Sequence, residues 1–290
     1  MLLRVASIIF PLFAIVMAGW VYGRVKRPDM SFANEINMDV FVPALVFAAL
    51  AGKSFDLASH QYLALGALLV VLGSGLLAWP LARLMGVEAK TFVPPMMFNN
   101  SGNMGLPLAV LAFGEAALPA AVVLFLVENL LHFSLGIYIL DHRARLSNVW
   151  RMPVVLAALA GLGLSMSGMA LWPPLLTAIR MLGETCIPLL LFSLGVRLTD
   201  ASFHTWRIGV AGAVIRPLLG MAIAWAAARM LDLNVQQSGM LLIFGALPPA
   251  VLNYVFAERY RQEPGKVASI VMIGNIASLL FMSLALAIVL

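Results

Sequence analysis

The stretch NNSGNMGLPLAVLAFGE (residues 99–115) places three asparagines, three glycines and a proline inside a long apolar segment of the chain. Pro107 has no backbone N–H, so the carbonyl of Asn103 loses its usual helical partner. An unsatisfied backbone group costs several kcal/mol in hydrocarbon, and unwound backbone persists only within protein or beside a cavity. The stretch therefore predicts a broken helix at membrane depth.

The composition is that of an integral membrane protein. Of the 290 residues, 62% are hydrophobic and only 11% are charged, whereas soluble domains average about 25% charged residues. Apolar runs near 20 residues long, enough to cross a bilayer core of roughly 30 Å, recur along the whole sequence. The net charge of +5 arises in short loops between these runs, which is a membrane-topology pattern and excludes nucleic acid as a partner.

The N-terminal run MLLRVASIIFPLFAIVMAGW resembles a signal peptide, with a basic start and small residues after the apolar core. Arg24, Lys26 and Arg27 follow it directly, whereas signal peptides carry their positive charge before the apolar run. We therefore expect it to stay as the first membrane span. The single cysteine, Cys186, lies in an apolar run and has no partner for an intrachain disulfide.

Breaks at charged residues, glycines and prolines divide the chain into ten predicted spans in an all-α membrane protein. They lie near residues 5–23, 34–52, 61–83, 91–113, 118–140, 153–171, 174–196, 206–229, 236–257 and 265–289.

The basic residues of the loops give the orientation. Three lie on one side, namely Arg4, Lys53 and Arg229, and 13 lie on the other: Arg24, Lys26, Arg27, Arg83, Lys90, Arg143, Arg145, Arg151, Arg197, Arg207, Arg259, Arg261 and Lys266. The positive-inside rule makes the second side cytoplasmic. We therefore expect a multi-pass protein of the cytoplasmic (inner) membrane with both termini outside the cytoplasm.

The two halves of the chain carry matching features. VPALVF (42–47) and IPLLLF (187–192) share a Pro-Leu-Phe pattern and lie 145 residues apart. Pro119 and Pro264 are separated by the same 145 residues. Five spans per half force the halves into opposite orientations, which is the inverted-repeat plan of secondary transporters. We expect a first repeat at residues 1–140, a cytoplasmic linker at 141–151 and a second repeat at 152–290.

The fourth span of each half carries helix breakers, Gly105 and Pro107 in the first and Pro248 and Pro249 in the second. A half-helix that begins after a break, which we expect near Gly105, points free N–H groups and a positive dipole end toward the gap and suits an anion. The simpler alternative is an ordinary proline kink. The predicted substrate-binding residues are Asn99, Asn100, Ser101, Asn103, Gly105, Pro107, Pro248, Pro249, Asn253, Asn275 and Arg216.

Ionisable side chains at membrane depth are functional candidates. Glu128 and His132 are four residues apart on one helix face, with Asn129 beside them. They are candidates for coupling to a proton or a sodium ion, and the alternative is a purely structural pair. Arg216 could supply positive charge for an anion or extend toward the cytoplasmic surface. No metal ion and no organic cofactor is expected.

Several motifs resemble the auxin efflux carrier family, which includes plant PIN proteins and many bacterial members. NSGNMGLP (100–107) resembles the fourth-span motif of that family, and ALPPAVLNYVFAERY (246–260) resembles its ninth span. FSLG (192–195) and VPALVF (42–47) resemble its seventh and second spans. The resemblance covers both halves of the chain in order and spacing.

The resemblance implies ten helices with crossed broken spans 4 and 9, a scaffold domain and a transport domain that moves like an elevator. It also implies export of small organic anions, often by a homodimer built through the scaffold. The family's substrate-contacting asparagine falls on Asn100, and its crossover proline falls on Pro248. The chain departs from plant members because it lacks a long central loop and an acidic residue in the third span, which argues for a short carboxylate such as malate or malonate rather than auxin.

Other classes fit the sequence less well. No HExxH zinc motif, recognisable serine nucleophile or pair of intramembrane aspartates is present, so an enzyme is not expected. Broken helices also build anion channels, for which ohmic rather than saturable flux is diagnostic. A third alternative is a sodium-coupled organic-anion importer of the bile-acid-symporter type, in which Ser101, Glu128 and Asn129 would supply oxygen ligands.

Overall fold

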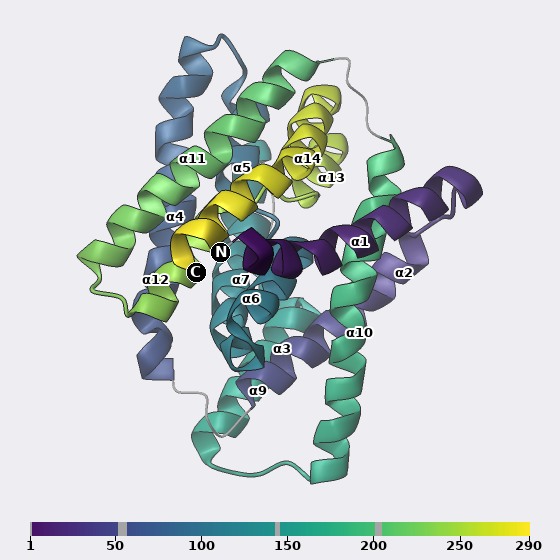
Figure 1. Cartoon of the computed structure of the whole chain (residues 1–290), viewed down its shortest axis with the longest axis vertical. Helices are drawn as coiled ribbons and strands as arrows, with labels where there is room; N and C mark the ends of the chain where they lie inside the picture. Colours follow the sequence, from purple (N-terminus) through teal and green to yellow (C-terminus); the bar gives the residue numbers. More distant parts are fainter. Residues whose placement is uncertain (1, 52–56, 143–145, 201–204) are drawn as a thin grey trace.

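The computed structural model describes residues 2–51, 57–142, 146–200 and 205–290, and these ranges are almost entirely helical (Figure 1). No β-strand forms within them, and one isolated β-bridge joins Asn99 to Pro249. The predicted all-α class is therefore confirmed. Three of the loop charges used for the topology, Lys53, Arg143 and Arg145, lie outside the described residues, as does part of the predicted linker.

A helix lies in each of the ten ranges predicted as spans, with interruptions in some. In the first half they are α1 (Leu2–Lys26), α2 (Ser31–Ile36), η1 (Asn37–Phe41), α3 (Val42–Leu50), α4 (Leu57–Leu84), α5 (Ala89–Met97), η2 (Ser101–Gly105), α6 (Leu106–Phe113), η3 (Glu115–Ala117), α7 (Leu118–Leu131), η4 (His132–Gly136) and α8 (Ile137–Leu140). In the second half they are η5 (Leu146–Arg151), α9 (Pro153–Ser167), α10 (Pro173–Arg197), η6 (Leu198–Asp200), α11 (Trp206–Met230), α12 (Val235–Ala246), α13 (Leu252–Arg259) and α14 (Pro264–Val289).

Local chemistry sets several of these boundaries. Pro119, Pro153 and Pro264 each lie in the first turn of a helix, where the missing N–H has no helical acceptor to lose. Gly168 adopts φ 67° and ends α9 in the left-handed conformation that glycine tolerates. The sixth predicted span, 153–171, is therefore too long, because its helix stops at Ser167.

Among the described residues, seven helices are long and apolar enough to cross a membrane. They are Leu3–Lys26, Ser31–Leu50, Ala58–Leu84, Glu115–Leu140, Pro173–Arg197, Trp206–Met230 and Pro264–Val289. The remaining three predicted spans correspond to the 15-residue α9 and to the two interrupted pairs, α5 with α6 and α12 with α13. The protein is thus polytopic, and the crossing of all ten segments stays a prediction.

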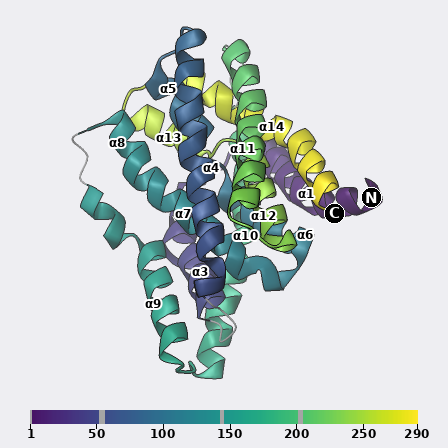
Figure 2. The same cartoon turned by 90° about the vertical axis from the view of Figure 1, so that its left-hand side faces the viewer.

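The helices pack as two groups (Figures 1 and 2). In what we call the first group, α1 packs on α10, and α3 packs on both α9 and α10. In the second group, α11 packs on α4, α12 and α14, while α4 also packs on α5 and α7. The contacts between the groups are fewer and include those of α10 with η2 and of α3 with α7.

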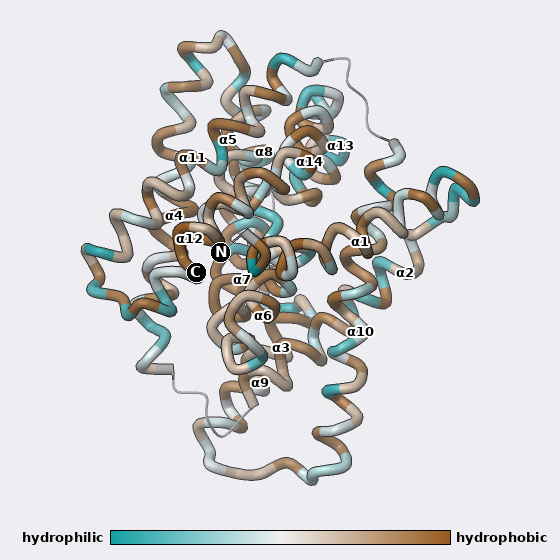
Figure 3. The backbone as a smooth tube through the Cα atoms, viewed as in Figure 1, coloured by the Kyte–Doolittle hydropathy of each residue, from teal (hydrophilic) through white to brown (hydrophobic). Residues whose placement is uncertain are grey.

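Hydrophobic residues predominate along the helices, and hydrophilic ones gather at turns such as those after α1 and α11 (Figure 3). Both ends of α11 pair arginine with tryptophan. Arg207 lies over the ring of Trp206, and Arg229 lies 4.4 Å from the ring centroid of Trp225. Aromatic and basic residues at helix ends are typical of the membrane–water interface, which supports a membrane-spanning α11.

Candidate functional site

Two interrupted helices cross at the centre of the second group. The first interruption separates α5 from η2 at residues 98–100, and the second separates α12 from α13 at residues 247–251. The two extended segments pair through their backbones: the N–H of Asn100 donates to the carbonyl of Pro248 at 2.8 Å, and the N–H of Ala250 donates to the carbonyl of Phe98 at 2.9 Å. Each extended segment thus supplies hydrogen-bond partners for some of the backbone groups that the break in the other helix leaves free.

The first break lies earlier than the position of Gly105 and Pro107 predicts. Helical structure resumes at Ser101, and Pro107 lies within the resumed helix, at the second residue of α6. Residues Ser101–Gly105 form a wider π turn, in which the N–H of Leu106 donates to the carbonyl of Ser101 five residues before. This wider turn carries the helix past the proline without a break.

The carbonyl ends of the broken helices are capped by side chains of the protein itself. Nδ2 of Asn99 donates to the carbonyl of Phe244 at 2.8 Å. Nη1 of the fully buried Arg216 donates to the carbonyl of Gly245 at 2.5 Å. On the other helix, Nδ2 of Asn253 donates to the carbonyl of Phe98 at 3.1 Å. The negative dipole ends are therefore already supplied with donors.

The amino-terminal ends of the two half-helices instead face a cavity of about 110 Å³. The cavity is lined by Asn34, Met38, Val42, Asn99, Asn100, Gly102, Asn103, Phe125, Glu128, Asn129, His132, Leu190, Ser193, Leu194, Arg197, Ala250, Val251 and Leu252. The first N–H groups of a helix have no acceptor within that helix. Two positive dipole ends, from η2 and from α13, thus meet at one cavity.

The cavity lies between the two helix groups. Val42 of α3 and Leu190 of α10 line it from the first group, and the crossing segments with α7 line it from the second. Three π turns supply lining residues, with Met38 in η1, Asn103 in η2 and His132 in η4. Single π turns in α-helices are frequent at functional sites because they re-aim side chains.

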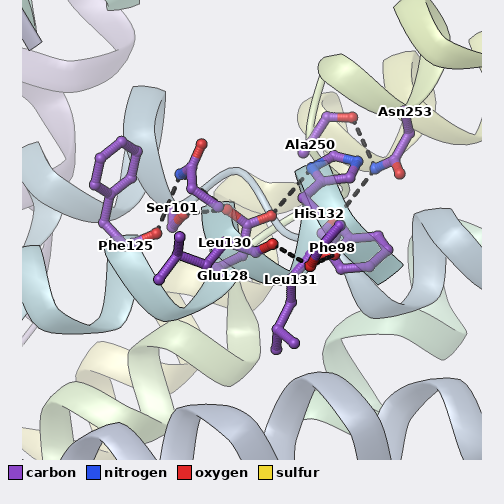
Figure 4. A network of polar contacts seen from close by, with 11 residues as sticks. Phe98, Ser101, Phe125, Glu128, Leu130, Leu131, His132, Ala250 and Asn253 are labelled. Atoms are coloured by element: carbon purple, nitrogen blue, oxygen red, sulfur yellow. Dashed lines mark hydrogen bonds and ion pairs between the residues drawn. The ribbon is translucent and has the colours of Figure 1, made fainter. Parts of the chain in front are cut away.

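An acid–base cluster forms one wall of the cavity (Figure 4). Oε2 of Glu128 accepts hydrogen bonds from the hydroxyl of Ser101 at 3.0 Å and from Nδ2 of Asn129 at 3.2 Å. Oε1 of Glu128 lies 3.3 Å from Nδ1 of His132. The imidazole of His132 stacks on Phe98 at a centroid distance of 4.2 Å, and Phe256 meets it edge-on.

Asn275 of α14, in the second half of the chain, contacts both crossing segments. Its Oδ1 accepts from Nδ2 of Asn100 at 2.9 Å, and its Nδ2 donates to the carbonyl of Pro249 at 3.1 Å. Ser278 hydrogen-bonds one turn further along α14 to the carbonyl of Asn275 at 2.6 Å. The side chain of Asn275 therefore ties both crossing segments to α14.

Comparisons with known proteins show similarity to membrane transporters. A family model described as "Membrane transport protein" matches residues 145–286. An uncharacterized transporter of Methanocaldococcus jannaschii is 23% identical over 299 residues, which cover 96% of each chain. An uncharacterized transporter of Methanothermobacter thermautotrophicus is 26% identical over 308 residues, which cover 95% of each chain.

The second half of the chain is therefore similar to this membrane transport protein family, and almost the whole chain is similar to two proteins named as transporters. The predicted resemblance to the auxin efflux carriers is thereby confirmed, because the family model covers those carriers and their PIN-like relatives. The relatives are named as transporters and not as enzymes. A membrane protein that transports a solute is also what the apolar helices and the central cavity indicate.

The predicted site residues fall into three sets. Those that line the cavity are Asn99, Asn100, Asn103, Glu128, Asn129 and His132. Those that hydrogen-bond through side chain or backbone to crossing or lining residues are Ser101, Pro248, Pro249, Asn253 and Asn275. Gly105, Pro107 and Arg216 are placed elsewhere: Gly105 faces Leu247, Pro107 is buried in α6, and Arg216 caps the end of α12.

Three polar residues that line the cavity were not predicted from the sequence. Asn34 begins the second predicted span, Ser193 lies in an apolar run, and Arg197 was counted only as a loop charge. The one sequence signal that could have indicated these residues is their polar character inside, or at the end of, an apolar span. Their positions at the cavity follow from the packing of α10 against η2 and of α2 against α10.

Proposed function

We propose that the protein is a secondary carrier that moves small organic anions across the cytoplasmic membrane by alternating access. The observation that carries the proposal is the asymmetry of the crossing helices. Their carbonyl ends are capped by Asn99, Arg216 and Asn253, whereas their amino-terminal ends open onto the cavity. A carboxylate is the ligand that free N–H groups and positive dipole ends favour.

Two side-chain amides and one guanidinium add to this preference. Asn100 and Asn103 lie at the start of η2, and Arg197 ends α10 on the opposite side of the cavity. Each can donate hydrogen bonds to a carboxylate oxygen. The geometry supports binding of an anion between the two helix groups, with donors from both.

The size of the cavity supports a small substrate. Its volume is about 110 Å³, whereas pockets that hold drug-sized ligands span roughly 300–1,000 Å³. A carboxylate of a few carbons, such as malate or malonate, fits this volume better than an aromatic compound such as auxin.

The inverted-repeat architecture and the elevator motion belong to the same proposal. Ten spans, a scaffold of α1–α3, α9 and α10, and a moving body of α4–α8 and α11–α14 account for a cavity at the boundary of the two groups. Sliding of one group past the other would expose that cavity to each side in turn. Outward transport, both termini outside the cytoplasm and a homodimer through the scaffold follow from the family resemblance and the loop charges.

Reconstitution in liposomes tests the proposal. Liposomes that contain the purified protein are loaded with an unlabelled carboxylate. Its exchange for labelled malate, malonate or longer carboxylates outside the liposomes is then measured. We expect saturable exchange of at least one short carboxylate and at least a tenfold loss of exchange in Asn100→Ala. The matched variant Gln236→Ala removes an exposed amide from α12, outside the cavity, and should exchange within twofold of wild type.

Four results would contradict the proposal. Exchange of no carboxylate excludes the substrate class, and equal exchange by Asn100→Ala and wild type excludes the site. Ohmic current without saturation would favour an anion channel instead. A strict requirement for sodium in the exchange would favour a symporter in which Ser101, Glu128 and Asn129 hold the cation.

A further inference from the structure

His132 borders two cavities. It lines the central cavity with Glu128, and it also lines a second cavity of about 10 Å³. The second cavity is bounded by Lys90, Pro94, Pro95, His132, Gly136, Leu140, Asn253, Phe256, Ala257 and Val267. The imidazole ring therefore separates the candidate substrate site from a pocket that approaches the predicted cytoplasmic side.

Each ring nitrogen of His132 has its own surroundings. Nδ1 lies 3.3 Å from Oε1 of Glu128, whose other oxygen is held by Ser101 and Asn129. Nε2 is buried and makes no hydrogen bond to any residue that the structure describes. A buried polar atom without a partner is costly and calls for an explanation.

Asn253, which also lines the second cavity, carries another buried polar atom without a partner in the described part of the chain. Oδ1 of Asn253 is also buried without a partner among the described residues, while Nδ2 of the same side chain is held by the carbonyls of Phe98 and Ala250. His132 and Asn253 thus border one space, and each carries a buried polar atom without a partner among the described residues. The cavity volume of about 10 Å³ is close to the roughly 10–15 Å³ that one water molecule needs, and a water there could bridge Nε2 and Oδ1.

We infer that His132 relays protons between Glu128 at the substrate cavity and a water in the second cavity. The step moves one proton and needs no other reactant: the Glu128 carboxyl gives its proton to Nδ1 of neutral His132, and the resulting imidazolium gives its Nε2 proton to the water. Glu128 is then a carboxylate and His132 is neutral again, as the opposite tautomer. This inference rests on the proposed carrier function and gives it a coupling ion.

Three neighbouring elements carry charged groups near the pair. Lys90 of α5 borders the second cavity and donates from Nζ to the carbonyl of Leu140 at 3.1 Å. Arg197 of α10 borders the central cavity, and Arg216 of α11 lies within electrostatic reach of Glu128. All three are cations and produce a positive field at the pair. An entering anion offsets this field, which ties protonation of Glu128 to substrate binding.

The test separates two activities of the same liposomes. Carboxylate exchange needs no net proton movement, whereas net carboxylate flux driven by a pH gradient does, and a trapped pH-sensitive dye reports the protons. We expect wild type to carry protons with net flux, and His132→Gln to lower the ratio of net flux to exchange at least tenfold. Asn253→Leu, which removes the water partner but leaves the ring, should lower the same ratio at least threefold.

His60→Gln, the same replacement on α4 away from both cavities, should keep the wild-type ratio. A wild-type carrier that exchanges carboxylate but whose net carboxylate flux moves no protons would overturn the relay and leave the carrier function standing. Equal losses of net flux and exchange in His132→Gln would also overturn it and assign the ring a packing role. Absence of exchange in the wild type would instead reject the carrier function. Thermal unfolding of each variant checks that it is folded, and the Asn253 variant keeps the test decisive should His132→Gln not fold.

Discussion

The side-chain amide of Asn100 donates a 2.9 Å hydrogen bond to Oδ1 of Asn275, a residue 175 positions away in the sequence. Both side chains are buried. This contact joins the start of the η2 half-helix to α14, and Asn275 also holds the carbonyl of Pro249 in the other crossing segment. One buried side chain therefore fixes the relative position of both broken helices.

Loss of this contact should be measurable as stability. Asn275→Ala leaves the amide of Asn100 and the carbonyl of Pro249 without that partner, and an unsatisfied buried group costs about 1–3 kcal/mol. We expect a lower midpoint of thermal unfolding in detergent for Asn275→Ala. In a double-mutant cycle with Asn100→Ala the two effects should be non-additive by about 0.5–3 kcal/mol. Additive effects would show that the two side chains act independently.

Arg216 should matter to the fold because it caps the end of α12. Its guanidinium is fully buried and donates to the carbonyl of Gly245. Arg216→Met leaves that carbonyl unpaired, and we expect a loss of about 1–3 kcal/mol in unfolding free energy. Arg229→Met, on the exposed end of the same helix, should change stability by no more than about 0.5 kcal/mol. Similar midpoints of thermal unfolding for the two variants would contradict the capping role.

Stability should also depend on the acidic loop residue Glu263. Burial raises the pKa of its carboxyl, but hydrogen bonds from Lys266 and Thr91 and the charge of Lys266 outweigh burial and lower the pKa below its ordinary value. A group with a lowered folded-state pKa stabilises the fold above its unfolded pKa of about 4.3, and this stabilisation is lost as pH falls through the folded-state value. Wild type should thus lose more stability than Glu263→Gln between about pH 5 and pH 3.

The carboxylate of Glu263 is only partly buried, so we expect a difference well below about 1 kcal/mol. Unfolding midpoints at a series of pH values measure it. Glu115→Gln removes an exposed carboxylate that makes no hydrogen bond or ion pair with the described residues, and it should keep the wild-type pH dependence. An identical pH dependence of wild type and Glu263→Gln would show that the bonds to Thr91 and Lys266 contribute nothing.

Much of the site was predictable because helix breakers and polar residues are rare in apolar spans. Asn99, Asn100, Glu128 and His132 stand out in the sequence for this reason, and the structure places all four on one cavity. The position of the first break was not predictable in the same way. Pro107 indicates a break near residue 103, but the chain unwinds at residues 98–100, where the other crossing segment supplies hydrogen-bond partners.

The partners themselves lie beyond any local pattern. The amide of Asn253 caps the carbonyl of Phe98 across 155 residues, and Arg216 caps Gly245 on a neighbouring helix. Sequence periodicity shows which face of a helix is apolar, but it does not show which carbonyl a distant side chain will reach. Arg197 was likewise interpreted as a topology signal, because a basic residue at the end of a span serves both roles equally well.

The contact between α1 and α10 gives a final prediction, with an internal control. A Cβ built on Gly195 would lie 1.9 Å from the carbonyl oxygen of Val16, so the two backbones touch and leave no room for a side chain. Gly195→Ala forces the helices apart, and overpacking of this kind costs about 1–3 kcal/mol. Among the described residues, none comes within 4 Å of the Cβ position of Gly163 in α9. Gly163→Ala should therefore be neutral or stabilising by up to about 1 kcal/mol, because alanine favours a helix more than glycine does. The midpoints of thermal unfolding of the two variants test this prediction. Equal midpoints would show that α1 and α10 pack less closely in the membrane than in the structure.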